Sequence, residues 1–382
     1  MRFPFLQDEK FYHAAAVLVG TMIGAGIYGI PFAFAKAGFW VGTLWLVLLM
    51  GIVAFFDILF AELILSTPGV HQVSGYVNVW LGPRARWLST VAYLISMYGA
   101  LLAYIIVAGE FLHNTLSHFL TIDPQLYSVC FALIGALFWF LRVKTIAKIE
   151  VILITLYTIA VLSIVVLGAS SVRFENFVGS TPEYWYLPYG VLLFAFAGLS
   201  ALPLQRQLLS GRERLMRPAI IGAILFTALL YMLFAFVVVG VSGDATSPSA
   251  LAGLYSFLGT PMIVLGSILG ILTITTSYII LGTALFETLH VDYRQRPSIA
   301  WFFVVTPPLL FFIAGLRNFI DIIGLVGAVA LGVQCVLLLI AYVRARRHRT
   351  REPEVSTPVS TLFVIALALF FTCGVVAELL LR

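Results

Sequence analysis

Charged residues are scarce in this chain. Aspartate, glutamate, lysine and arginine make up 10% of its 382 residues, whereas hydrophobic residues make up 62%. A typical soluble domain carries about 25% charged residues, which cover its surface. A charge content this low excludes a soluble globular chain and indicates that most of the surface contacts lipid. We therefore predict an integral membrane protein built only of helices, with the bilayer as a partner.

Reactive and metal-binding residues are also few. The three cysteines lie in apolar segments without paired spacing, which argues against a disulfide framework and a metal site. The six histidines lie near the ends of apolar segments or between them, and no Ser/His or two-histidine helical motif lies inside one. We expect no enzyme activity and no cofactor. The basic residues suit anionic lipid headgroups, so we expect no nucleic-acid partner.

Eleven apolar runs approach the roughly 20 residues that a helix needs to cross a bilayer. They lie at about 12–36, 39–66, 86–119, 125–141, 146–168, 186–205, 216–241, 260–286, 298–316, 319–343 and 359–381. With a cytoplasmic N-terminus, 18 of the 22 lysine and arginine residues fall on the cytoplasmic side. Cytoplasmic loops carry such an excess, which sets the orientation. We expect a plasma (inner) membrane protein with its N-terminus cytoplasmic and its C-terminus outside.

Two nearly matching stretches interrupt the first and sixth apolar runs. Ala25-Gly26-Ile27-Tyr28-Gly29-Ile30-Pro31 and Ala197-Gly198-Leu199-Ser200-Ala201-Leu202-Pro203 share Ala-Gly-aliphatic at the start and aliphatic-Pro at the end. Glycine and proline five residues apart remove backbone hydrogen bonds and open a helix. Open backbone inside a membrane is tolerated only where protein or a water-filled cavity surrounds it. Paired breaks therefore predict a transporter binding site.

The two breaks also define a repeat. The second break lies five spans after the first, an odd offset, so the two broken helices run in opposite directions, as in an inverted five-plus-five repeat. We predict a cytoplasmic tail (1–11), a first repeat of helices 1–5 (12–168), an inverted second repeat of helices 6–10 (186–343), a basic cytoplasmic loop (344–358) and an additional helix 11 (359–381). The alternative is that Gly20, Gly24 and Gly26 only allow close helix packing. The matched second break weighs against it.

The first break carries a family resemblance. Gly20-Thr21-Met22-Ile23-Gly24-Ala25-Gly26-Ile27, followed by Pro31, resembles the first-helix signature of the amino acid/polyamine/organocation superfamily. Within it, the chain is similar to the amino acid/auxin permeases and to the bacterial hydroxy and aromatic amino acid (tryptophan/tyrosine) permeases. The resemblance covers the whole chain in organisation, but only spans 1 and 6 carry specific motifs. It implies a leucine-transporter-like fold, in which broken helices 1 and 6 hold an amino acid near the bilayer midplane.

The residues at the breaks suit both ends of an amino acid. Exposed amides at Gly24, Ala25 and Gly26 suit a carboxylate, and carbonyls around Phe194 to Ala197 suit an ammonium group. The resemblance implies that Tyr98 or Tyr104, on span 3, closes over the substrate; they lie about 120° apart in projection, so only one faces the site. Small, uncharged residues at the breaks favour a neutral, aromatic or large amino acid. The candidate substrate residues are Thr21, Gly24, Ala25, Gly26, Tyr98, Tyr104, Phe194, Phe196, Ala197 and Gly198.

The coupling ion is open between sodium and a proton. Thr276 and Ser277 on span 8, with Thr273 nearby, resemble a sodium cage completed by span 1 carbonyls, although such hydroxyls often bond only to their own helix. Sodium is the only metal that the sequence suggests. For protons, Asp57 and Glu110 are intramembrane carboxylates and hence candidates. Glu62 lies near the end of its span, where it could reach headgroups.

Four charges could form gates. Lys10 and Asp292 flank spans 1 and 8 on the cytoplasmic side, and Lys36 and Asp321 lie on the opposite side. Exposed ion pairs contribute only about 0–1 kcal/mol, which suits a latch that opens in every cycle. Separate anchoring of each charge at the interface is the alternative.

These features favour secondary active import of an amino acid by ion-coupled alternating access. A metal-ion transporter on the same fold would need Asp, Asn or Met ligands at the breaks, which hold Gly, Ala, Phe and Ser. An amino-acid-binding channel or sensor without coupled transport is the other alternative.

Overall fold

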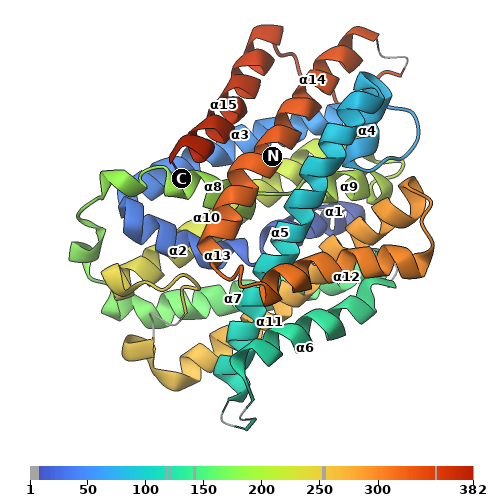
Figure 1. The fold of residues 1–382 in the computed structure, drawn as a ribbon. Coiled ribbons are helices and arrows are strands. Elements are labelled where there is room, and N and C mark those ends of the chain that lie inside the picture. Colours follow the sequence, from blue (N-terminus) through green and yellow to red (C-terminus); the bar gives the residue numbers. More distant parts are fainter. Residues whose placement is uncertain are drawn as a thin grey trace.

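The computed structural model describes residues 8–117, 119–120, 122–140, 143–251, 255–348 and 351–381, and every regular element in them is a helix (Figure 1). The α-helices are α1 (Glu9–Met22), α2 (Gly26–Ala37), α3 (Phe39–Ser66), α4 (Val73–Leu81), α5 (Pro83–Leu116), α6 (Pro124–Ala136), α7 (Val143–Gly168), α8 (Leu187–Ala195), α9 (Ala201–Leu208), α10 (Met216–Ser242), α11 (Tyr255–Glu287), α12 (Pro297–Ile313), α13 (Phe319–Leu325), α14 (Gly332–His348) and α15 (Thr361–Leu381). π-helical segments follow α11 (Thr288–Asp292) and join α13 to α14 (Val326–Leu331).

Each of the eleven predicted spans is helical. By length and composition, seven of the described helices are each able to cross a membrane, and α1 with α2 forms an eighth span bent by 52°. Helices α6 and α12 are shorter, and the sixth span is divided into α8 and α9. The sequence analysis did not predict α4, which lies between the second and third spans and is too short to cross a bilayer.

The broken helices lie side by side in opposite directions. Helix α1 packs against α9 and α2 packs against α8, so the first half of one span meets the second half of the other. Pro203 lies in the first turn of α9, where its missing amide costs no helical hydrogen bond. The fold therefore has the predicted inverted arrangement, with the breaks at residues 23–25 and 196–200 facing each other.

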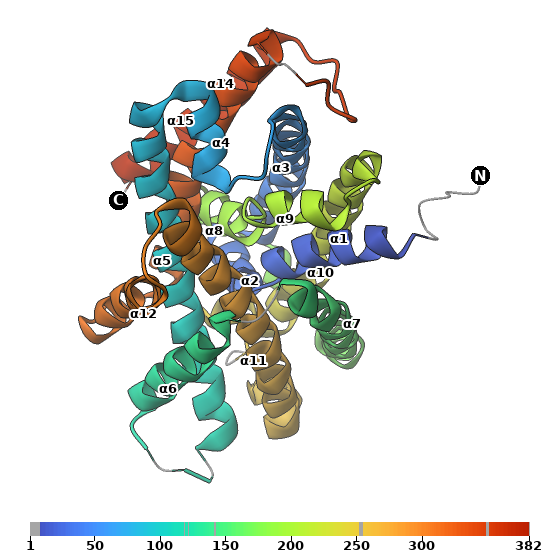
Figure 2. The same cartoon turned by 90° about the vertical axis from the view of Figure 1, so that its right-hand side faces the viewer.

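The remaining helices surround this centre. Helices α14 and α15 pack together on α3 at one edge, and α6 and α12 lie along α5 (Figures 1 and 2). Glu62, on α3, is 1% exposed and accepts hydrogen bonds from the Tyr342 hydroxyl (3.3 Å) and the Thr357 amide (2.9 Å). The expectation that Glu62 reaches headgroups is wrong, because the segment before α15 covers it.

Candidate functional site

The first break presents backbone amides. The Gly24 amide donates to Met22 O (2.8 Å) and the Tyr28 amide donates to Ala25 O (3.1 Å). Within the described part of the chain, the amides of Ala25, Gly26 and Ile27 have no backbone acceptor. These amides begin the 12-residue helix α2, whose N-terminus carries a partial positive charge. The break therefore presents unpaired amides at Ala25 and Gly26, where a carboxylate site stays a prediction. The expectation of an exposed amide at Gly24 is wrong, because that amide is bonded to Met22 O.

The second break presents carbonyls beside these amides. The Phe196 amide donates to Leu192 O (2.8 Å) and the Ala197 amide to Phe194 O (3.1 Å), which ends α8 with its carbonyls directed into the break. One of these carbonyls, Ala195 O, lies 2.8 Å from the hydroxyl of Tyr231 on α10. The C-terminal end of α8 carries a partial negative charge, which favours a cation.

Tyr231 ties the two breaks together. Its hydroxyl also lies 2.7 Å from Met22 O, the last carbonyl of α1, and its ring is fully buried against Phe196. One hydroxyl proton therefore serves two carbonyls, one from each broken helix. The sequence analysis missed Tyr231. Its only local signal is a tyrosine in the middle of an otherwise apolar span.

A small cavity lies between the breaks. Its volume is about 30 Å³, which holds one or two waters. No charged residue lines it. Its walls are Thr21, Met22, Gly26, Ser96, Met97, Ala100, Tyr104, Phe194, Ala197, Leu199, Ser200, Leu281, Val326 and Leu331. An amino acid enters this cavity only if the walls move apart.

Two glycines allow close approach at this cavity. A Cβ atom on Gly24 would lie 2.6 Å from the Tyr104 hydroxyl oxygen, and one on Gly26 would lie 2.8 Å from Ala195 Cα. Tyr104 therefore covers the first break. Tyr98 does not face it, because its hydroxyl donates to Phe303 O on α12 (2.8 Å). Of the two predicted tyrosines, the structure places only Tyr104 at the cavity.

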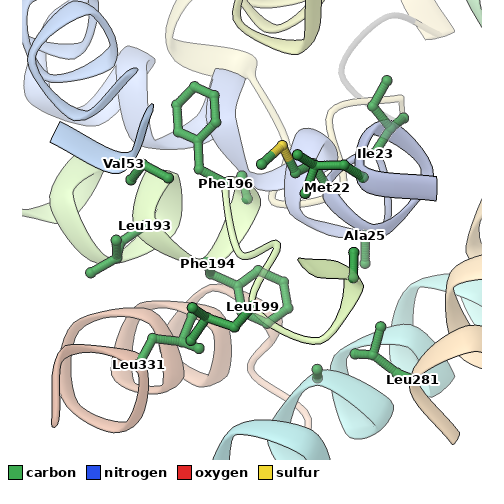
Figure 3. Packing of buried hydrophobic residues seen from close by; sticks show 14 of the residues in the cluster. Met22, Ile23, Ala25, Val53, Leu193, Phe194, Phe196, Leu199, Leu281 and Leu331 are labelled. Atoms are coloured by element: carbon green, nitrogen blue, oxygen red, sulfur yellow. The ribbon is translucent and has the colours of Figure 1, made fainter. Parts of the chain in front are cut away.

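Phe194 and Phe196 point in different directions from the same segment (Figure 3). Phe194 lines the cavity, whereas Phe196 packs on Tyr231 with ring centroids 5.3 Å apart. Gly198 also lies outside the cavity, against Leu18 and Met22. Thus five of the ten predicted substrate residues line the cavity, and Gly24 and Ala25 adjoin it. The predicted residues Phe196, Gly198 and Tyr98 do not line it.

A model of the tryptophan/tyrosine permease family matches residues 7–379. The chain belongs to this family. Tyrosine-specific transport system 1 of Haemophilus influenzae is 21% identical over 366 residues, covering 90% of each chain. Glutamine transporter 2 of Aliivibrio fischeri is 20% identical over 355 residues, covering 90% of this chain and 91% of the relative. These relatives are transporters and not enzymes, so the permease carries an amino acid across a membrane.

The crystal structure of MhsT in complex with L-phenylalanine has a similar fold. Its TM-score is 0.71 at 14% sequence identity, and the match covers 98% of both chains. This likeness confirms the leucine-transporter-like fold of the permease.

The hydroxyls predicted to hold sodium are mostly engaged by their own helices. Thr276 donates to Thr273 O (2.9 Å) and Thr273 donates to Gly270 O (3.0 Å), both within α11. Ser277 alone crosses to α1, where its hydroxyl lies 2.9 Å from Gly20 O and 3.5 Å from Ile23 O. The permease thus places one hydroxyl and two carbonyls, without a carboxylate, between α1 and α11.

The predicted carboxylates differ in their surroundings. Glu110, on α5, accepts a hydrogen bond from Ser249. Asp57, on α3, is buried, and its Oδ2 atom has no hydrogen-bond partner in the described structure. Both lie outside the cavity between the breaks.

The structure describes three of the four predicted gate side chains, so the pairing of Lys10 with Asp292 stays a prediction. Lys10 donates to Ser210 O (2.8 Å), and the side chain of Asp292 lies outside the described residues. Lys36 is exposed above the Phe32 ring, 5.6 Å from its centroid, and Asp321 pairs with Asn318 at the start of α13. No ion pair joins Lys36 to Asp321 within the described residues. Separate anchoring therefore fits Lys36 and Asp321 better than a latch.

Arg206 connects the second half of the sixth span, α9, to a neighbouring helix. Arg206, on α9, donates to the carbonyls of Ile64 (2.7 Å), Thr67 (3.1 Å) and Gly69 (2.8 Å). Ile64 lies in the last turn of α3, and Thr67 and Gly69 follow it, so the guanidinium binds carbonyls at and just beyond the C-terminal end of the helix. The contact joins a broken helix to an unbroken one, and the sequence analysis missed it.

Replacing Arg206 by methionine should lower the free energy of unfolding by about 1–3 kcal/mol, because it leaves partly buried carbonyls unpaired. Thermal unfolding of the purified protein measures the change. The control is Arg214→Met, at an exposed arginine in the next loop. Equal melting temperatures for the two variants would contradict a structural role for Arg206.

Proposed function

We propose that the protein is a secondary transporter that imports a neutral amino acid with an aromatic or large side chain, coupled to a cation, by alternating access. It would lie in a plasma membrane with its N-terminus cytoplasmic. The observation that carries this proposal is the meeting of two opposite helix ends at one cavity. Unpaired amides of Ala25, Gly26 and Ile27 lie beside the terminal carbonyls of α8. An amino acid carries a carboxylate and an ammonium group that match these two ends.

The cavity walls support a neutral substrate. They include small and apolar side chains and no charge, so a charged substrate side chain would remain unpaired there. The ring of Phe194 and the ring of Tyr104 are the largest walls and could enclose an apolar side chain. The names of the relatives support the class, since they describe a tyrosine-specific system and a glutamine transporter.

Two places could hold the coupling cation. Ser277 with Gly20 O and Ile23 O supplies neutral oxygens for sodium. The buried carboxylates Asp57 and Glu110 could carry a proton instead.

Uptake into proteoliposomes tests the proposal. Labelled tryptophan, tyrosine, leucine and glutamine are offered under an inward sodium gradient at equal pH, or under an inward proton gradient without sodium. We expect saturable uptake of at least one large neutral amino acid under one gradient, which also names the cation. Folded protein that neither binds nor accumulates any of them would contradict the proposal. A voltage-clamp conductance would then support a channel.

Ala100→Leu should shift selectivity towards smaller substrates. Ala100 projects into the cavity from α5 and is 5% exposed, so a larger side chain takes space from the substrate. A change of one or more methylene groups in such a pocket alters selectivity by about 10- to 200-fold. Competition by tryptophan, leucine and alanine in the same preparation measures it, and the ratio cancels differences in protein yield. An unchanged order of the three would place the side chain elsewhere.

A further inference from the structure

Asp57 differs from the other carboxylates inside the membrane. It lies on α3, is 1% exposed, and its Oδ2 atom has no hydrogen-bond partner among the described residues. By contrast, Glu62 accepts bonds from Tyr342 and Thr357, and Glu110 accepts one from Ser249. Asp57 is therefore buried with one carboxyl oxygen unpaired, which is costly and marks it as a candidate functional group.

Asp57 also lines a cavity of its own. This second cavity, of about 20 Å³, is walled by four residues of the unwound segment, Phe196 to Leu199, together with Cys335 of α14 and Phe371 of α15. It therefore lies behind the break, on the side to which the Phe196 ring turns (Figure 3).

The two cavities share walls. Ala197, Leu199 and Leu331 line both the cavity between the breaks and the cavity of Asp57. Residues that line both cavities therefore lie between the proposed substrate position and the carboxyl group of Asp57. A ligand that moves the break changes the surroundings of Asp57, and a change of charge on Asp57 acts back on the break with equal coupling energy.

Among the described residues, no lysine or arginine lines the cavity of Asp57 to compensate a negative charge. The helices that pack against α3 carry titratable and charged groups, which include Cys335 and Tyr342 on α14, Tyr189 on α8, Tyr231 and Arg217 on α10, Glu378 and Cys373 on α15, Arg206 on α9, and Tyr28 and Lys36 on α2. The remaining basic groups of α14 are Arg344, Arg346, Arg347 and His348, at its C-terminal end. Of all these groups, Cys335 shares the cavity and interacts electrostatically with Asp57. Arg206 is bound to carbonyls at the C-terminal end of α3, and Lys36 is exposed at the end of α2. An isolated ionised carboxylate costs several kcal/mol in such surroundings.

The side chains at this position suit a proton better than sodium. Hard cations require several oxygen ligands, and among the cavity walls only Asp57 has an oxygen in its side chain. A proton needs no such shell, because it neutralises the carboxyl group by itself.

We propose that Asp57 is the proton-binding residue of the transport cycle, placed behind the unwound segment 196–199 that also walls the substrate cavity. The inference rests on the proposed transport function and names its coupling ion. Asp57 takes a proton from water on one side of the membrane, stays neutral while the substrate occupies the first cavity, and releases the proton to water on the other side. One proton crosses with each substrate, and no bond other than O–H forms or breaks.

This role is tested with the full chain in proteoliposomes, by comparison of the wild type with the variants Asp57→Asn and Glu62→Gln. Asparagine keeps the size of the side chain but cannot release a proton. Glu62→Gln is the matched control, because it neutralises a buried carboxyl group on the same helix that has protein partners. Exchange of labelled tryptophan without a pH gradient reports substrate passage, and accumulation under an inward proton gradient reports coupling.

One proton per substrate allows about tenfold accumulation for each unit of pH difference. We expect wild type and Glu62→Gln to accumulate substrate and to carry protons inward with it, measured by an internal pH dye. Asp57→Asn should exchange substrate but accumulate none and carry no protons. The proposal would be overturned, with the transport function intact, if Asp57→Asn accumulated substrate to the wild-type level. It would also be overturned if accumulation by the wild type required sodium and did not depend on the pH gradient. Wild type that neither exchanges nor accumulates any of the four amino acids would instead contradict the proposed function.

Labelling of the wild type covers the case in which Asp57→Asn fails to fold. Dicyclohexylcarbodiimide enters membranes and modifies protonated carboxyl groups, and peptide mass spectrometry locates the product. We expect modification at Asp57 that decreases as the pH rises and that changes when tryptophan is added. A lack of modification at Asp57 at every pH, with Glu110 modified instead, would move the proton to Glu110 and overturn the proposal.

Discussion

Gly26→Ala should reduce substrate uptake by about 100-fold, the cost that a misplacement near 1 Å imposes on a positioned site. A Cβ atom at Gly26 would lie 2.8 Å from Ala195 Cα and 3.0 Å from Ala195 Cβ. The first contact is with backbone, which cannot rotate away, so the two breaks must separate. Separation moves the unpaired amides of α2 away from the carbonyls that end α8. Initial uptake rates and equilibrium binding of labelled substrate, measured on the same preparation, give the loss.

Two further glycines make this result specific. A Cβ atom at Gly51, on α3, meets no atom within 4 Å, so Gly51→Ala should transport as well as wild type. At Gly24 the first contact is the Tyr104 hydroxyl, the end of a side chain that can turn. Gly24→Ala should therefore lose less activity than Gly26→Ala. Full activity of Gly26→Ala would show that the breaks do not need this close approach.

The breaks were predictable because their cause is local. Gly26 with Pro31, and Gly198 with Pro203, weaken a helix within one segment, and the repetition in the second half supplied the pairing. The eleven spans were predictable for a similar reason, since length and hydropathy decide whether a segment can cross lipid. Among the described α-helices, α4 alone was not predicted, because it is too short to give either signal.

The direction in which each side chain points was not predictable. Tyr98 and Tyr104 both lie on α5. Their spacing in the sequence gives the angle between them around the helix axis, but not how the helix is rotated in the bundle. The structure turns Tyr104 towards the break and Tyr98 towards Phe303. Phe194 and Phe196 diverge for a related reason, since α8 ends between them and helical spacing no longer applies.

Contacts between segments that are distant in the sequence were even less predictable than side-chain directions. Lys10 and Asp292 were predicted as a gate because they flank spans 1 and 8 on the cytoplasmic side, whereas the contact that the structure shows for Lys10 is with Ser210 O, 200 residues away. Arg206 reaches the end of α3 from α9, and Tyr231 reaches Met22 from α10. Such pairs depend on how helices pack, which no local pattern records.

Tyr231→Phe should raise the substrate KM at least about tenfold, equivalent to 1.4 kcal/mol, and lower the free energy of unfolding by about 1–3 kcal/mol. The substitution keeps the ring and its packing on Phe196. It removes only the hydroxyl that lies 2.7 Å from Met22 O and 2.8 Å from Ala195 O. Both carbonyls are buried at the broken ends, so they lose a donor and the two ends lose their shared tether.

The matched control is Tyr278→Phe, which removes another buried hydroxyl. That hydroxyl donates to Ala132 O on α6 (3.2 Å), away from both breaks. Urea or thermal unfolding should show a loss of stability in both variants, since each leaves a buried carbonyl without its donor. Only Tyr231→Phe should change KM, because only this hydroxyl joins the two halves of the repeat at the substrate cavity. An equal KM for the two variants would show that the Tyr231 hydroxyl contributes to stability alone. Packing would then align the two breaks, mainly through the close approach of Gly26 to Ala195.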